Sequence, residues 1–295
     1  MIGAIGAIGA IRAMRAIRAA TTSAVAAALA APALAQESPN IVAPTQPAPG
    51  SFVARTSLRA VLFDGGEPAV ARDGFVLEER FRLAYGITKE LSIDGALPFY
   101  QGSFDDPAPG QAPFETSPVG LGDLDVNLKF RLFKEDLGPV DTVRMSVFAG
   151  TEMPTGTGGF STESFDPQVG LAAMAILGHH GFSGSLAYRF VTGDTDEVLF
   201  PGDSGADVFA ANVGYLYRLA PDEFTEEHVG AWYATVELLS TAETNGDFEL
   251  TLAPGILFEA PRFAFELTVG FPIVDDVQYR PSSSFTGSIG LRFLF

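Results

Sequence analysis

The chain has 295 residues and a formal net charge of −18 at neutral pH, from 18 Lys and Arg against 36 Asp and Glu. Because the neutralisation of phosphates needs Lys and Arg, so acidic a chain is a poor binder of nucleic acid. The absence of cysteine excludes disulfides, thiolate metal sites and a cysteine nucleophile. No residue pattern in the sequence implies a metal or a cofactor.

Residues 1–35 have the layout of a secretory signal peptide. A basic start is followed by an apolar stretch of small residues and by an A-x-A cleavage site, Ala33-Leu34-Ala35. The alternative is a disordered Ala-rich tail, and both Met1 and Met14 fit as the start. The basic residues of this layout are Arg12, Arg15 and Arg18.

Residues 36–50 are rich in proline and are expected to form an extended periplasmic leader. From residue 51 onward the sequence predicts one all-β domain, a transmembrane antiparallel barrel of about twelve strands. Apolar residues recur at a period of two in segments of about ten residues, the length of a tilted membrane strand. The predicted strands are 52–63, 75–87, 91–102, 121–133, 142–153, 167–178, 182–192, 207–219, 230–241, 248–258, 262–273 and 284–295.

The fourth predicted strand shows why one face must meet lipid. Five apolar side chains lie on one face, and the other face carries Asp123, Asp125, Asn127, Lys129 and Arg131. In a soluble sandwich such charges would be buried without partners, at several kcal/mol each. A closed barrel in lipid leaves the charged face in a polar lumen and leaves no sheet edge.

The connections between these segments alternate in length. Long stretches such as 103–120 and 193–206 alternate with shorter turns such as 88–90 and 179–181. Barrels with both termini in the periplasm place short turns there and long loops outside the cell. The alternation therefore favours a barrel in the outer membrane.

The last predicted strand ends the chain on an aromatic residue, as outer-membrane barrels do. Its apolar face is expected to serve as a signal for the barrel assembly machinery. The residues of this face are Phe285, Ile289, Leu291, Phe293 and Phe295.

Three further segments are Tyr85-Gly86-Ile87-Thr88-Lys89-Glu90-Leu91, Leu97-Pro98-Phe99-Tyr100 and Gly120-Leu121-Gly122-Asp123-Leu124. They resemble the outer-membrane protein family of the meta-pathway of phenol degradation. The resemblance implies a transporter-type barrel in the outer membrane, and it carries over no catalytic residues.

Charged residues of the polar faces are predicted to line the lumen, where rings of charge can set selectivity. They can equally pair across the interior and fill it, because about twelve strands leave only a narrow interior. The predicted lumen residues are Glu78, Arg80, Arg82, Asp94, Asp123, Asp125, Lys129, Arg131, Arg144, Arg189, Arg218, Glu237, Glu249, Glu266 and Arg292.

Acidic residues cluster in or beside the predicted extracellular loops. Ca²⁺ binding or bridging to anionic lipid is one interpretation, but no loop follows the D-x-[DN]-x-[DN]-G calcium pattern. Solvated loops are the preferred interpretation. The residues are Asp105, Asp106, Glu115, Asp194, Asp196, Glu197, Asp203, Asp207, Asp275 and Asp276.

Aromatic residues at strand ends are predicted to form girdles at the lipid–water boundary. Tyr100 and Phe133 could instead point inward along a path for an aromatic substrate. The proposed girdle residues are Phe99, Tyr100, Phe133, Phe182, Trp232 and Phe258.

Three functions remain open at this point. The first is passage of small hydrophobic or aromatic molecules, and the second is a non-conducting barrel that presents acidic loops. The third, an outer-membrane lipid hydrolase, is disfavoured because His179, His180 and His228 lie in or beside predicted periplasmic turns. The expected partners are membrane lipid, lipopolysaccharide, the assembly machinery and an unknown small molecule.

Overall fold

The computed structural model describes residues 37–65, 67, 69–109, 111, 113–138, 140–224 and 229–295. The proposed signal peptide and His228 lie outside the described residues. In the part that is described, no helix is long and apolar enough to cross a membrane.

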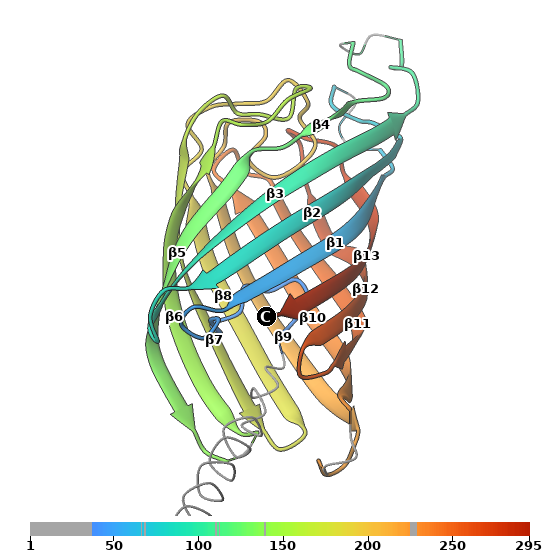
Figure 1. The fold of residues 1–295 in the computed structure, drawn as a ribbon. Helices are drawn as coiled ribbons and strands as arrows, with labels where there is room; N and C mark the ends of the chain where they lie inside the picture. Colours follow the sequence, from blue (N-terminus) through green and yellow to red (C-terminus); the bar gives the residue numbers. More distant parts are fainter. Residues whose placement is uncertain are drawn as a thin grey trace, which may run out of the picture. The chain divides into compact units, whose positions relative to one another are not determined.

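The described residues form an antiparallel barrel (Figure 1). Strand β1 pairs with β2 on one side and with β13 on the other, so the sheet closes on itself. The strands are β1 (Phe52–Phe63), β2 (Gly74–Gly86), β3 (Leu91–Phe104), β4 (Val119–Leu121), β5 (Leu124–Asp136), β6 (Thr142–Met153), β7 (Asp166–Leu177), β8 (His180–Arg189), β9 (Val208–Ala220), β10 (Ala231–Glu243), β11 (Phe248–Glu259), β12 (Phe263–Asp276) and β13 (Ser283–Leu294).

The short strand β4 and the longer β5 occupy one position in the wall, because both pair with β3. The barrel thus has twelve strand positions, and the predicted fold class is confirmed. The sequence predicted a single strand over 121–133 here. The strand is interrupted opposite Pro98 of β3, which has no N–H to donate to a neighbouring strand.

The two ends of the barrel differ, as the alternation of connection lengths predicted. One end, here called the turn end, carries the turns at 87–90, 178–179 and 260–262, and the connections from β5 to β6 and from β9 to β10, which include residues outside the described part, also lie there. Phe52 and Phe295 exchange backbone hydrogen bonds at this end, so the first and last strands meet there. The opposite loop end carries longer connections such as 105–118 and 190–207, together with two shorter ones, 244–247 and 277–282. The turn end is the periplasmic end of such barrels.

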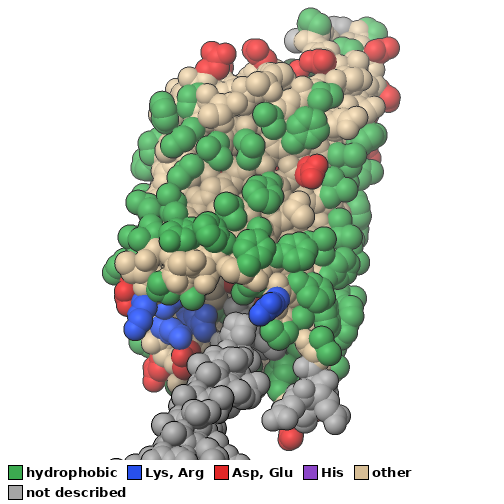
Figure 2. Space-filling model, viewed as in Figure 1, with side chains coloured by type: hydrophobic (Ala, Val, Ile, Leu, Met, Phe, Trp, Pro, Cys, Tyr) green, Lys and Arg blue, Asp and Glu red, His purple; other side chains and the backbone are tan. Residues whose placement is uncertain are grey.

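The apolar residues cover the outside of the wall and polar residues fill the inside. Leu128 on β5 is 50% exposed, whereas Glu237 on β10 is completely buried. Figure 2 shows hydrophobic side chains over the wall and charged ones mainly at its two ends. A water-soluble protein has the opposite arrangement, so the outer surface belongs in lipid.

Candidate functional site

The N-terminal segment 37–49 lies within the barrel interior. Asn40 donates from its side-chain amide to Glu237 at 2.5 Å, and Lys129 Nζ donates to the Ala43 carbonyl at 2.9 Å. Ile41 and Ser38 are almost completely buried. The sequence predicted an extended periplasmic leader here. The segment does not join the sheet as a strand, since it forms only one isolated β-bridge with the wall, at Pro49. Its backbone groups therefore take their hydrogen-bond partners from side chains of the lumen, as the Ala43 carbonyl does from Lys129.

Ion pairs hold one side of the interior near the turn end. Arg292 contacts both Glu259, at 2.6 Å, and Glu37 of the N-terminal segment. Arg55 pairs with Glu266 and also donates to the Pro39 carbonyl. These contacts anchor the segment to β1, β11, β12 and β13.

The other side of the interior near the turn end is basic. Lys129 is joined there by three arginines on β2, β5 and β6. The buried Nε atoms of two of them have no hydrogen-bond partner among the described residues. The interior therefore carries carboxylates on one side and an excess of cations on the other. The three arginines are Arg82, Arg131 and Arg144, of which the first two have the unpaired Nε.

A cavity of about 370 Å³ occupies the half of the interior nearer the loop end. Asn40 of the N-terminal segment contributes to its lining, as do Phe200 and Asp203 of the loop between β8 and β9. Its other lining residues come from strands on opposite sides of the barrel. The cavity is thus bounded by both the N-terminal segment and a loop, in addition to the wall.

Two arginines of the cavity lining share one carboxylate. Glu78 accepts from Arg59 at 2.6 Å and from Arg80 Nε at 2.6 Å. The side chain of Glu78 is only 4% exposed, whereas those of Arg59 and Arg80 are 38% and 40% exposed. In this corner two guanidinium groups share one carboxylate, and Asp125 of the same cavity also interacts electrostatically with Arg80.

An aromatic group stands beside this charged corner. Tyr100 stacks on Phe160 with ring centroids 4.9 Å apart and lies 5.4 Å from Phe200. The guanidinium of Arg59 lies 5.3 Å from the centre of the Phe200 ring. The girdle prediction is wrong for Tyr100, and the alternative of an inward ring holds. Its position on β3 gives it the same parity as the lumen residue Asp94.

The other proposed girdle residues lie differently. Phe99, Phe133, Phe182 and Trp232 are exposed on the outside of the wall. The ring of Phe258 packs against Trp232 at 4.8 Å. Tyr100 is therefore the member of the predicted set whose ring reaches the cavity.

The loop 190–207 between β8 and β9, here called the lid loop, folds over the cavity. Leu199 is completely buried in an apolar cluster with side chains from β1, β2 and β3. Arg72 pairs with Glu197 at 2.7 Å in a buried contact, and Arg189 donates to the Pro201 carbonyl at 2.6 Å. The lid loop is therefore held by packing and by charge.

The prediction of solvated acidic loops is wrong for Glu197 and Asp203. Glu197 is the buried partner of Arg72. The carboxylate of Asp203 accepts the backbone N–H groups of Leu199 and Phe200 at 2.9 and 2.7 Å. Burial raises the pKa of Asp203 to about 7. Acidic residues that remain exposed in the loops include Asp105, Asp106, Glu115, Asp194, Asp196, Asp275 and Asp276.

The remaining predicted lumen residues take several positions. Asp125 accepts from Asn127 and Gln168, and Arg189 pairs with Glu152 at 2.5 Å, both beside the cavity. Glu249 pairs with Arg280 of a loop.

The structure assigns structural contacts to two further members of the predicted set. Asp123, between β4 and β5, accepts backbone N–H groups of Thr155, Gly156 and Thr162 and so holds the loop between β6 and β7. Arg218, at the turn end of β9, donates to the Asp222 carbonyl. Asp94 on β3 is partly buried.

Sequence reasoning missed several interior charges. Arg55 and Arg59 of β1 alternate with outward residues such as Leu58, so the period of two could have found them. Arg280 lies between β12 and β13, where no periodicity applies. Arg72 also lies in a loop, and only the folded lid loop brings Glu197 to it.

The two described histidines lie at the turn end and are held by hydrogen bonds. His180 Nδ1 lies 2.7 Å from the Tyr215 hydroxyl. The ring nitrogens of His179 lie 3.2 and 3.0 Å from the carbonyls of Arg218 and Asp222. These contacts assign them a structural role at the turn end.

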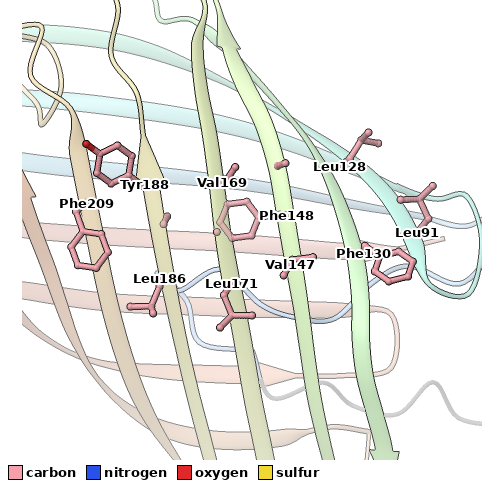
Figure 3. A pocket seen from close by; sticks show the side chains of 13 residues that line it. Leu91, Leu128, Phe130, Val147, Phe148, Val169, Leu171, Leu186, Tyr188 and Phe209 are labelled. Carbon is pink, nitrogen blue, oxygen red and sulfur yellow. The ribbon is translucent and has the colours of Figure 1, made fainter.

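The outer wall also carries an apolar hollow of about 620 Å³. Figure 3 shows its lining side chains on β3 and on β5 to β9. Leu128, Phe130, Val169, Leu186 and Phe209 are all exposed there. In a membrane such a hollow is filled by lipid chains, because it lies on the lipid-facing side of the wall.

Comparison with known proteins agrees with this architecture. Residues 70–278 match the family model described as "Putative MetA-pathway of phenol degradation". The chain belongs to this family. No curated protein matches the sequence.

Among solved structures, the fold is similar to that of an outer membrane channel from Pseudomonas putida F1. The TM-score is 0.57 at 13% sequence identity, over 88% of this chain and all of that one. The NanC porin aligns at a TM-score of 0.42 and 11% identity, over 82% and 98% of the two chains. The β domain of the Bordetella autotransporter BrkA aligns at 0.48 and 12%, over 83% and 99%. With its closed barrel and apolar outer surface, the protein resides in the outer membrane.

Proposed function

We propose that the barrel mediates the passage of small hydrophobic or aromatic molecules across the outer membrane. The observation that carries this proposal is the cavity of about 370 Å³ inside the lumen, with Tyr100 and Phe200 in its lining. Cavities of this size hold small ligands. Passage requires the N-terminal segment and the lid loop to move, because both contribute to the lining.

A second candidate is a non-conducting barrel with a structural or surface role. It is favoured by the ion pair and the hydrogen bonds between the N-terminal segment and the wall, which occupy the interior. No observation favours lipid hydrolysis, since the described histidines are engaged with backbone carbonyls and a tyrosine.

Single-channel recording in planar bilayers separates the two candidates. The full-length mature barrel is compared with a variant that lacks residues 37–48. We expect a small conductance for the first and a conductance at least several times larger for the second, because the deletion removes the segment that occupies the lumen. Aromatic solutes should interrupt the current of the first. If neither protein conducts, passage is refuted and the structural role stands.

We also propose that the barrel assembly machinery recognises β13 and that lipopolysaccharide contacts the loop end. The side chain of Phe295 is well exposed, while its backbone closes the barrel against Phe52. Phe295→Ala keeps that backbone and removes the aromatic signal. We expect a lower yield of folded protein in the outer membrane, with unchanged refolding in detergent. An unchanged yield in cells would contradict the signal.

A further inference from the structure

The cavity has a polar corner and an apolar part, which together define a ligand. Arg59, Arg80 and Glu78 make the polar corner, and both guanidinium groups line the cavity. The contact to Glu78 uses Arg80 Nε. Among the described residues, the two terminal nitrogens of Arg80 make no hydrogen bond. A guanidinium with both terminal nitrogens available binds a carboxylate with two parallel hydrogen bonds.

The part of the cavity beside this corner is aromatic and aliphatic. Tyr100 is already stacked on Phe160, which fixes its ring, and Phe200 lies at 5.4 Å from it. Aliphatic side chains continue the lining, so a flat apolar ring would be covered on several sides. These side chains are Val61, Ala96, Pro98, Val208, Ala210 and Leu239.

The acidic residues of the cavity lining are engaged elsewhere. Glu152 pairs with Arg189, and Glu249 pairs with Arg280. Asp125 accepts from two amides, and Asp123 binds backbone N–H groups. Asp203 accepts two backbone N–H groups, and burial raises its pKa to about 7, so a large part of it is uncharged near neutral pH. The charged corner thus offers the terminal nitrogens of Arg80 as free donors, whereas the unpaired Nε of Arg59 is buried.

We propose that this cavity binds a small aromatic carboxylate, with its ring against Tyr100 and Phe200 and its carboxylate on Arg80. The inference deepens the proposed function and rests on it for the claim that the ligand passes through the barrel. A purely apolar aromatic would leave the guanidinium without an acceptor. An aliphatic carboxylate would leave the aromatic rings without a flat partner.

Isothermal titration calorimetry on the folded protein in detergent tests the site, with benzoate as the probe. Benzyl alcohol has the ring without the charge, and acetate has the charge without the ring. We expect benzoate to bind at least ten-fold more tightly than either. If benzyl alcohol binds as tightly as benzoate, the carboxylate is not recognised and the proposal is overturned.

Two variants locate the binding. Arg80→Gln removes the charge while Arg59 still pairs with Glu78, and Phe200→Leu removes the aromatic ring that the lid loop places beside Tyr100. Each should weaken benzoate binding at least ten-fold, and each must still migrate as a folded barrel on an unheated gel. Arg262→Gln, on an exposed turn at the other end, is the control and should bind as the unmodified protein does. Unchanged binding in both Arg80→Gln and Phe200→Leu would overturn the site.

Current recordings with benzoate separate this inference from the proposed function. Binding together with benzoate-dependent interruption of the current supports both. Binding to a barrel that never conducts would refute passage and leave the site. A conducting barrel that does not bind benzoate would refute the site alone.

Discussion

At the scale of single residues, the substitutions that a strand position tolerates depend on whether its side chain faces lipid or the lumen. Leu128 faces lipid and is half exposed, whereas Thr241 faces the cavity. An arginine near the middle of the lipid face loses its hydration without gaining a partner. One that faces the cavity enters a polar space that has room for it.

Leu128→Arg should therefore lower the free energy of unfolding by about 2–4 kcal/mol, the penalty for Arg near the bilayer midplane. Thr241→Arg should cost much less. The measurement is urea unfolding in bilayers. Similar losses for the two variants would mean that the faces of β5 and β10 have been assigned to the wrong environments.

Ion pairs in the interior should contribute more to stability than those at the surface, because solvent does not replace a lost partner in the interior. Arg292 is buried between Glu37 and Glu259, whereas Lys134 pairs with Asp136 in solvent. Removing one partner of a buried pair leaves an uncompensated charge. Arg292→Met should therefore destabilise the protein by about 3–5 kcal/mol. Lys134→Met should cost about 1 kcal/mol or less. Equal effects in thermal or urea unfolding would show that water reaches Arg292.

At the scale of elements, the lid loop depends on the half-buried carboxyl group of Asp203. Burial raises the pKa of Asp203 to about 7, well above the usual range of an aspartate, while Arg189 favours and Glu152 opposes its charged form. A carboxyl with a raised pKa binds more protons in the folded state than in the unfolded one. The free energy needed to unfold the lid loop should therefore fall as the pH rises from about 4 to about 7.

Asp203→Asn should remove this dependence, because the amide oxygen can still accept from Leu199 and Phe200. Limited proteolysis of the lid loop at pH 4, 6 and 8 measures the effect. We expect cleavage of the unmodified protein to accelerate with pH after correction for protease activity, and cleavage of the variant to stay level. An identical pH profile for both proteins would exclude Asp203 as the group responsible.

At the scale of the whole molecule, the closure of the sheet into a barrel determines the environment in which the protein is stable. The pairing of β1 with β13 leaves no free edge, and the lipid-facing apolar side chains are stable only in a membrane or a detergent. Protein refolded in detergent should show a β-rich circular dichroism spectrum and should migrate faster unheated than boiled. A substantial helical signal from residues 51–295 would be incompatible with the barrel.

The sequence by itself determined the barrel, because the side-chain period of two follows from strand geometry alone. The bounds predicted for β1 and β6, 52–63 and 142–153, coincide with those observed, and the other positions shift by three residues or fewer apart from the break at Pro98. Which charges meet was decided only by tertiary structure. Arg72 and Glu197 lie 125 residues apart, and Arg292 meets Glu37 across almost the whole chain. No local period encodes such contacts, since they depend on where an irregular segment folds. For the same reason the proline-rich segment gave no sequence signal of its place in the lumen, whereas the shared parity of Tyr100 and Asp94 on β3 did indicate an inward ring.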